Sequence, residues 1–477
     1  MVLFGCERDR RRRGILRARG GGSDGQNEKN GMQNRETIFA GETHEPSMVH
    51  NGALTKSDLL GPHGTASAMK RARIARLSGL LFLVVVPHSG ICAAQSAWVA
   101  SWTTPQQIPE PENALPPGAL HDATLRQIVH LSLGGTELRV HLSNAFGTAP
   151  LHFTSVHIAR PLAPDGPAID PATDKALTFA GATDVIVPAG AEFVSDPVTE
   201  PVAPLSDLAV TFHLDDPPAR ETGHPGSRAT SYYVPGDQVA AASFTNPGKV
   251  DHWYQLAAVD VLAPADAATV VALGDSTTDG HGATTNGNDR WTDDLAVRLQ
   301  QAARPVGVAN AGIGGNHLLI DGLGPSALAR IDRDLLAPAG VRWVIVFEGI
   351  NDLDGLTIHG EMPVADHAAL VARIIAAYQQ IVVRAHAHGL RVYGATVTPD
   401  GGSGFYHPGP LNEADRQAVN AWIRAAGHFD AVVDFDAVVR DPRQPDRLLP
   451  AFDCGDHLHP SPAGYHAMAN AIPLSLF

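Results

Sequence analysis

Two patterns of apolar positions divide the chain. From about Ala97 to Leu262, apolar residues alternate with polar ones, whereas after Leu262 they gather in short continuous runs. Alternation with a period of two is typical of a strand with one buried face, and short apolar runs are typical of strands buried on both faces. The sequence therefore predicts two domains of different architecture, at residues 97–262 and 267–477.

The first domain has the pattern of antiparallel strands. Leu138, Val140 and Leu142 alternate with polar residues, and residues 208–214 repeat the pattern. A second strand-like run, residues 125–133, precedes Gly134-Gly135, which is typical of a hairpin turn. Pro and Gly clusters punctuate the segment, and it contains no long amphipathic helical pattern. We expect an all-β sandwich or jelly roll.

Six aromatic residues of this domain have two interpretations. They could form a flat platform on which sugar rings stack, or they could pack in the core or an interface, as aromatic residues of β domains more often do. The six are Trp98, Trp102, Tyr232, Tyr233, Trp253 and Tyr254.

The second domain alternates buried strands with helices. Helical spacing of apolar residues recurs over 370–382, and residues 291–303 and 412–426 also have a helical pattern. The five apolar runs that predict strands are residues 269–273, 306–309, 343–347, 392–396 and 431–433. This alternation predicts an open, three-layer α/β/α structure with a parallel sheet, whose ligands bind at the carboxyl ends of the strands.

The first 94 residues differ from both domains. Residues 1–68 carry a run of four arginines and little apolar periodicity, which predicts a wrongly assigned start or a disordered extension. From Met69, a basic segment, an apolar run at 77–86 and a small-residue stretch ending at Ala94 follow one another. This is the layout of a secretory signal peptide at 69–94, and the apolar run is too short to span a bilayer. We expect a secreted or periplasmic protein, with a cytoplasmic tail and short anchor as the alternative.

The net charge of the chain indicates which classes of molecule it can bind. The 477-residue chain is 44% hydrophobic and 18% charged, which is typical of a globular protein, and its net charge is −15. Residues 1–94 carry 14 of the Lys and Arg residues and 8 of the Asp and Glu residues, so the chain without them has a net charge of −21. Such a protein suits neutral or cationic partners and repels anionic surfaces. We expect no nucleic-acid partner and no stable membrane anchor.

Four short stretches carry the candidate chemistry, three of them directly after predicted strands. They are Gly274 to Gly280, Asn310 to Asn316, Glu348 to Asp352, and Asp456 to Pro460. A serine at a strand end presents its hydroxyl and its N–H, and a glycine N–H and an asparagine amide can donate to the same point. An aspartate three residues before a histidine can bind its Nδ1, which leaves Nε2 as a base.

In this order, the four stretches resemble those of the SGNH hydrolases, also called the GDSL lipase/acylhydrolase superfamily, over about residues 267–477. The resemblance implies a flavodoxin-like fold with Ser276 as nucleophile, His459 as general base and acid, and Asp456 as the partner that orients it. The family's usual leucine after the serine is Thr277 here, a departure that removes no catalytic group.

The same resemblance implies an oxyanion hole with three donors. They are the N–H of Ser276, the N–H of Gly315 and the side-chain amide of Asn351. Gly315 is chosen over Gly312 because the family's glycine lies five residues after the asparagine of its block, here Asn310. No Gly-x-Ser-x-Gly sequence is present, which disfavours the nucleophile-elbow hydrolase fold.

Two further features have open interpretations. Three histidines, His457, His459 and His466, crowd near two aspartates, but their spacing fits no common zinc pattern, and we expect neither a metal nor an organic cofactor. The glycine-rich segment at residues 399–410 is either a flap facing the substrate or a plain surface loop.

The expected function is an exported serine esterase that removes short acyl groups, above all acetate, from polysaccharide. The two-domain layout resembles the SGNH subgroup related to proteins named as arylesterases associated with xylan degradation. The first alternative is an arylesterase or lysophospholipase acting on lipid-like or aromatic esters. The second is a glycan-binding protein with a relic catalytic fold, which the intact candidate residues disfavour.

Overall fold

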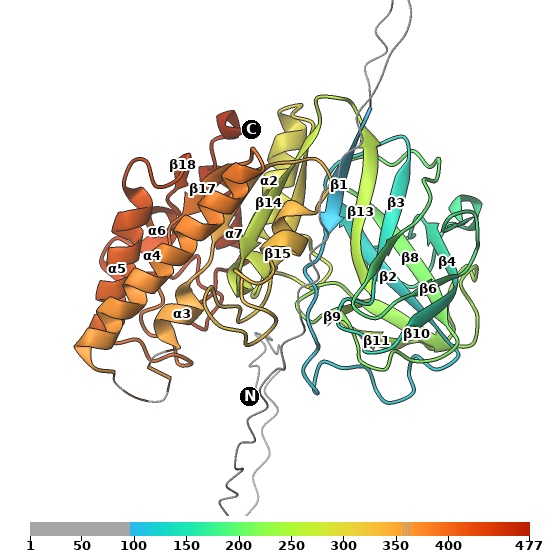
Figure 1. The fold of residues 1–477 in the computed structure, drawn as a ribbon, viewed down its shortest axis with the longest axis horizontal. Helices are drawn as coiled ribbons and strands as arrows, with labels where there is room; N and C mark the ends of the chain where they lie inside the picture. The colour runs from blue at the N-terminus through green and yellow to red at the C-terminus, as the bar shows by residue number, and fades with distance from the viewer. Residues whose placement is uncertain (1–95, 356, 359, 361) are drawn as a thin grey trace, which may run out of the picture. The chain divides into compact units, whose positions relative to one another are not determined.

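The computed structural model describes residues 96–477, except 356, 359 and 361 (Figure 1). The sequence predictions for residues 1–68 and 69–94 lie outside this range. Strands β1 to β13 form antiparallel sheets, and a parallel sheet with helices begins at β14 (Ala268–Gly274). Both parts of the predicted fold class are confirmed.

Two large antiparallel sheets make up most of the first domain, and β9 (Gly223–His224) and β12 (Trp253–Tyr254) form a third sheet of two strands. One has the order β1 (Ala97–Thr103), β13 (Leu256–Ala263), β3 (Leu138–Ser143) and β7 (Glu192–Val194). The other has the order β11 (Gly248–Val250), β10 (Ser231–Pro235), β2 (Ala123–Leu131), β8 (Ser206–Leu214), β4 (Leu151–Ala159) and β5 (Lys175–Ala176), with β6 (Val185–Val187) also paired to β4.

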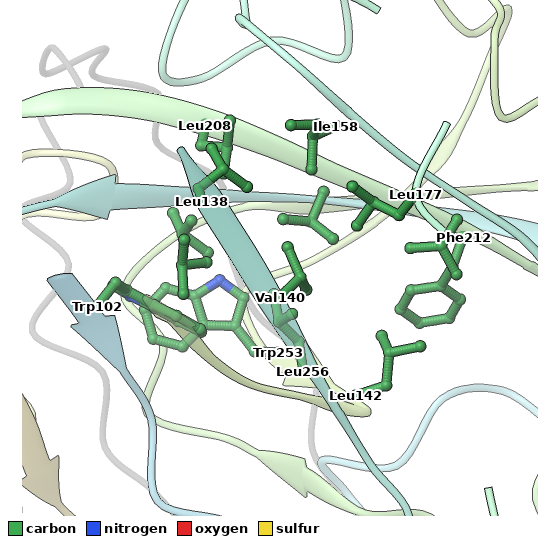
Figure 2. Close-up of a cluster of buried hydrophobic side chains, with 14 of the residues drawn as sticks. Trp102, Leu138, Val140, Leu142, Ile158, Leu177, Leu208, Phe212, Trp253 and Leu256 are labelled. Atoms are coloured by element: carbon green, nitrogen blue, oxygen red, sulfur yellow. The ribbon is translucent and has the colours of Figure 1, made fainter. Parts of the chain in front are cut away.

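The inward faces of the two sheets share one apolar core, part of which Figure 2 shows. Val140 of β3 and Phe212 of β8 are fully buried there, and burial of such side chains contributes about 1.5–3 kcal/mol each. Trp102 and Trp253 meet edge to face in this core, with ring centroids 4.9 Å apart. Tyr232 and Tyr254 are also fully buried, so four of the six aromatic residues support the packing interpretation.

The predicted hairpin at Gly134-Gly135 is wrong. Strand β2 pairs with β8 and β10, whereas β3 pairs with β13 and β7 of the other sheet. Gly135 forms a bridge with Val202, and a Cβ at Gly134 would lie only 2.5 Å from the carbonyl oxygen of Val202. The two glycines therefore allow a close approach of backbones where the chain crosses between sheets.

The second domain contains a parallel sheet in the order β15 (Val306–Gly312), β14, β16 (Val341–Phe347), β17 (Arg391–Ala395) and β18 (Ala431–Val433). This is the flavodoxin-like strand order, with the first strand of the domain between the second and the third. Each of the five apolar runs falls at one of these strands.

Helices cover both faces of this sheet. Successive residues of β14 point to opposite faces: Val271 packs in one core cluster and Val270 in another. The first cluster includes η2 (Ile331–Leu336), α4 (Val364–Ala387) and α5 (Pro410–Arg424). The second includes α2 (Trp291–Gln301), α6 (Phe435–Val439) and α7 (Pro462–Ala471). The predicted three-layer α/β/α architecture is confirmed.

Helix α4 is the one helix in the described range that is long and apolar enough to cross a membrane by length and composition, with a mean hydropathy of 1.3. Its residues Leu370, Ile374 and Ile381 are buried in the core against the sheet. Core helices of soluble proteins pass the same test, so α4 is explained by its packing.

Hydroxyl side chains of the first domain meet the edge strand β15. The Ser132 hydroxyl accepts a hydrogen bond from the N–H of Val308 (2.9 Å), and the Thr103 hydroxyl donates to the carbonyl oxygen of Asn310 (3.1 Å). A Cβ at Gly307 would lie 2.3 Å from the carbonyl oxygen of Ala100, so strand β1 runs directly against β15.

Candidate active site

The candidate nucleophile lies at the carboxyl end of the central strand β14. Ser276 is the first residue of the short helix α1 (Ser276–Asp279), and the carboxylate of Asp275 caps this helix by accepting from the N–H of Thr277 (2.9 Å). Gly274 is required because a Cβ there would lie 2.1 Å from the hydroxyl of Thr278 and 2.6 Å from the carbonyl oxygen of Phe347. The tight turn presents Ser276 at the edge where ligands of parallel sheets bind.

Buried acidic and basic side chains lie behind this turn. Burial raises the pKa of Asp275 to about 7, with a contribution from the negative charge of Asp352. Burial also raises the pKa of Glu348 well above its ordinary value. Arg330 is buried 3.8 Å from Glu348 and donates to the carbonyl oxygens of Gly274 (3.0 Å) and Ala311 (2.7 Å). Arg330 thereby ties the end of β14 to the end of β15.

The structure brings Ser276, His459 and Asp456 into one hydrogen-bonded chain. Ser276 Oγ and His459 Nε2 lie 2.8 Å apart, and His459 Nδ1 lies 2.7 Å from Asp456 Oδ2. The other carboxylate oxygen, Asp456 Oδ1, accepts the N–H groups of Leu458 (2.9 Å) and His459 (2.8 Å). A serine, an imidazole and a carboxylate in this order can generate a nucleophile for acyl transfer.

The surroundings keep His459 uncharged at neutral pH. Burial lowers the pKa of His459 to about 4; the neighbouring His281 and Arg228 also lower it, and the hydrogen bond and negative charge of Asp456 act in the opposite direction. Although burial acts to raise the pKa of Asp456, hydrogen bonds from His281 and His459 hold it well below its usual range. Above pH 4, a neutral imidazole therefore faces the serine and an ionised carboxylate lies behind it.

Three hydrogen-bond donors lie at the ends of adjacent strands. Asn351, in helix α3 (Ile350–Asp354) after β16, donates through Nδ2 to the carbonyl oxygen of Asn316 (2.7 Å), next to Gly315. The N–H groups of Ser276 and Gly315 have no acceptor among the described residues. These donors can stabilise the negative oxygen of a tetrahedral intermediate.

The loop that carries Gly315 is shaped by its neighbours. Gly315 has a φ of +70°, in the left-handed region that favours glycine, and a Cβ there would lie 2.5 Å from Leu323 Cδ1. The carboxylate of Asp352 accepts the N–H groups of Leu318 (2.7 Å) and Leu319 (3.1 Å) from the same loop. The segments that follow β15 and β16 therefore hold each other in place through these hydrogen bonds.

Sequence reasoning missed the functional contacts of Tyr406 and His281. The Tyr406 hydroxyl donates to Asn351 Oδ1 (2.6 Å), so the segment at 399–410 supports a candidate oxyanion donor, while its Phe405 is 41% exposed. His281 lies 3.5 Å from Asp456, and its ring centroid lies 4.0 Å from that of His459. Its only signal in the sequence is its position five residues after Ser276.

The histidines that suggested a metal site have other partners. His457 Nδ1 lies 2.5 Å from Asp453, and His466 Nδ1 lies 3.2 Å from Asp294 on helix α2. His281, Asp456 and His459 do present ligand atoms within 4.8 Å of one another. Both ring nitrogens of His459 are already engaged, by Ser276 and Asp456.

Replacing Asn351 with alanine is expected to lower kcat for an ester substrate by about 10²–10³-fold, because one oxyanion donor is lost. Steady-state kinetics on p-nitrophenyl acetate measure this effect. Tyr406→Phe is the matched control, since it keeps the amide and removes only the hydroxyl that orients it, so its kcat should fall far less. An unchanged kcat in Asn351→Ala would show that the amide stabilises no charge in the transition state.

Comparisons with known proteins concern the second domain. Residues 272–467 match the model of the GDSL-like Lipase/Acylhydrolase family. No curated protein matches the sequence.

Similar solved structures include a GDSL-like lipase from Bacteroides thetaiotaomicron (18% identity, 43% of this chain and 84% of that chain covered, TM-score 0.31). Another is the lipase/acylhydrolase from Enterococcus faecalis (20% identity, 43% and 92% covered, TM-score 0.32). The acetyl xylan esterase AlAXEase is also similar (20% identity, 43% and 96% covered, TM-score 0.32).

Proposed function

We propose that the protein is a carboxylic ester hydrolase that removes short acyl groups, above all acetyl, from polysaccharide. The match of residues 272–467 to the GDSL-like lipase/acylhydrolase family model supports an ester hydrolase. The observation that carries a serine mechanism is the hydrogen-bonded chain from Ser276 through His459 to Asp456. We also propose export, on the signal-peptide pattern at 69–94, which the N-terminal sequence of the exported protein tests.

In the proposed mechanism, Ser276 Oγ attacks the ester carbonyl while His459 Nε2 accepts the hydroxyl proton. The N–H groups of Ser276 and Gly315 and the amide of Asn351 stabilise the tetrahedral oxyanion. His459 then returns the proton to the leaving alcohol, and an acyl-enzyme forms on Ser276. Water, activated by His459, attacks this acyl-enzyme and releases the acid.

Two properties favour a short acyl group on a neutral polymer. Leu323 packs against Gly315, so an apolar side chain limits the space beside a candidate oxyanion donor. The chain without residues 1–94 has a net charge of −21, which disfavours approach to anionic phospholipid.

A second candidate, hydrolysis of aromatic or lipid-like esters, is favoured by apolar side chains near the site. Ile320 is 59% exposed on the loop that carries Asn316, and Phe405 is 41% exposed beside Tyr406. Exposed apolar groups next to a catalytic centre can contact an aryl ring or an acyl chain.

Hydrolysis of p-nitrophenyl esters from acetate to laurate distinguishes these candidates. From the proposed short-acyl specificity we expect the highest kcat/KM at acetate and butyrate, and release of acetate from acetylated xylan. The Ser276→Ala variant gives the background rate for each ester.

A maximum at eight carbons or longer would contradict the short-acyl proposal and support the second candidate. If no ester is hydrolysed in a Ser276-dependent way, the esterase mechanism fails, and glycan binding by the intact protein becomes the function to test.

A further inference from the structure

A side chain of the first domain reaches the candidate catalytic carboxylate through one intermediate residue. We propose that Arg228 and His281 are positioning residues of the active site: Arg228 holds His281 in the tautomer that presents an N–H to Asp456. This inference rests on the proposed function and assigns the first domain a part in it.

The contacts form a continuous path. Arg228 Nη2 lies 3.3 Å from His281 Nδ1, and His281 Nε2 lies 3.5 Å from Asp456 Oδ2. The same oxygen lies 2.7 Å from His459 Nδ1. The two imidazole rings also pack against each other, tilted by 34°. Asp456 is therefore held between two histidines.

The guanidinium determines which ring nitrogen of His281 carries the proton. Arginine has five N–H donors and no acceptor, so a hydrogen bond from Arg228 requires an unprotonated Nδ1 on His281. A neutral imidazole with a free Nδ1 carries its proton on Nε2, the nitrogen that faces Asp456. His281 thus acts as an N–H donor to the carboxylate.

This donor completes the contacts of the Asp456 carboxylate. Two backbone N–H groups bind Oδ1, and His459 binds Oδ2 from one side. The charged groups that contact His281 and His459 here are Arg228 and Asp456, and the Tyr465 hydroxyl of helix α7 donates to the carbonyl oxygen of His281 (2.5 Å). With His281 on its other side, the carboxylate is fixed in the orientation that holds the Nδ1–H tautomer of His459.

Hydrogen bonds to the second domain hold Arg228 in place. Its φ is +50°, an uncommon value for a residue with a side chain, which persists only where the surroundings impose it. The carbonyl oxygen of Arg228 accepts the N–H of Asn286 (2.8 Å), and the side chain of Asn286 accepts the N–H of Thr230 (2.8 Å). Arg290 also donates to the carbonyl oxygen of Ser227. The backbone before and after Arg228 is thus hydrogen-bonded to the hydrolase domain.

Two substitutions of His281 separate donation from packing. His281→Phe keeps a ring against His459 but removes the N–H, and His281→Gln keeps an N–H donor without the ring. Loss of a hydrogen bond to a charged group lowers kcat/KM by about tenfold or more. We therefore expect that fall for His281→Phe, through kcat with KM little changed, and substantial recovery in His281→Gln. His466→Phe, an exposed histidine whose partner is Asp294, is the matched control and should keep the activity of the unsubstituted protein.

Substitution of Arg228 gives a second, independent measurement. Arg228→Met removes a positive charge that lowers the pKa of His459, so the acidic limb of the kcat/KM profile should move to higher pH. Arg228→Lys keeps the charge and should leave the limb near its original position. A structural role alone would reduce the amount of folded enzyme without moving this limb.

The outcomes separate this inference from the proposed function. If the unsubstituted protein shows no hydrolysis above the Ser276→Ala background, the proposed function fails. If it hydrolyses esters, but His281→Phe keeps full activity or falls no further than His281→Gln, the inference alone is overturned. An unmoved acidic limb in folded Arg228→Met overturns the role of Arg228. If Arg228→Met fails to fold, the comparison of His281→Phe with His281→Gln decides whether the inference holds.

Discussion

Ser276→Ala is expected to lower kcat for p-nitrophenyl acetate by about 10⁴-fold or more, since removal of the nucleophile from such a triad leaves only the catalysis of the oxyanion hole and of binding. The hydroxyl that lies 2.8 Å from His459 Nε2 is lost, and no acyl-enzyme can form at this position. Pre-steady-state measurements with an excess of a chromogenic ester, in which any burst of product disappears, check this directly.

Ser206→Ala serves as the control for this experiment. Ser206 lies at the start of β8 in the first domain, and its hydroxyl donates only to the nearby carbonyl oxygen of Ala203. Its kcat should equal that of the unsubstituted protein. Ester hydrolysis by Ser276→Ala within about tenfold of the original rate would place the nucleophile elsewhere.

Asp456→Asn is expected to reduce kcat by about 10⁴-fold while leaving the fold intact. Two backbone N–H groups bind Asp456 Oδ1, so an asparagine would keep its oxygen there and turn its NH₂ group toward His459 Nδ1. Nδ1 would then have to accept, and the ring proton would move to Nε2, facing the serine. The imidazole could no longer accept the proton of Ser276.

Steady-state kinetics together with thermal unfolding test this expectation. Asp453→Asn is the matched control, because Asp453 binds His457 in the same loop and lies outside the chain of hydrogen bonds to Ser276. A loss of activity in Asp456→Asn with an unchanged Tm would identify a tautomer effect. Retention of kcat would show that the orientation of His459 does not depend on this carboxylate.

Much of the fold was predictable because each domain has a clear hydrophobic period. Buried parallel strands need apolar residues on both faces, and the run at residues 269–273 falls within β14. The sandwich was predictable from the alternation in β3 and β8, but the pairing of its strands was not. Gly134-Gly135 has the composition of a hairpin turn, and only the position of Val202 across from it shows that these glycines serve a crossing between sheets.

The candidate site was predictable where its residues follow strand ends within short motifs. Ser276, Gly315 and Asn351 come after adjacent strands, and Asp456 lies within the same turn as His459. The contributions of Tyr406 and Arg228 depend on contacts across the fold.

Their distance along the chain explains why these contacts were missed. Tyr406 lies 55 residues from Asn351, and Arg228 lies 53 residues from His281 and belongs to the other domain. No local period or spacing encodes a contact between loops that packing alone brings together.

The hydroxyl contacts of Ser132 and Thr103 along β15 bear on how the protein avoids aggregation. An open edge strand exposes unpaired N–H and C=O groups, which can pair with the edge of another molecule. Here the N–H of Val308 and the carbonyl oxygen of Asn310 are bound by side chains, which cannot extend a sheet as a strand would. The first domain thus protects the hydrolase sheet from edge-to-edge association, and a hydrolase domain produced alone would lose that protection.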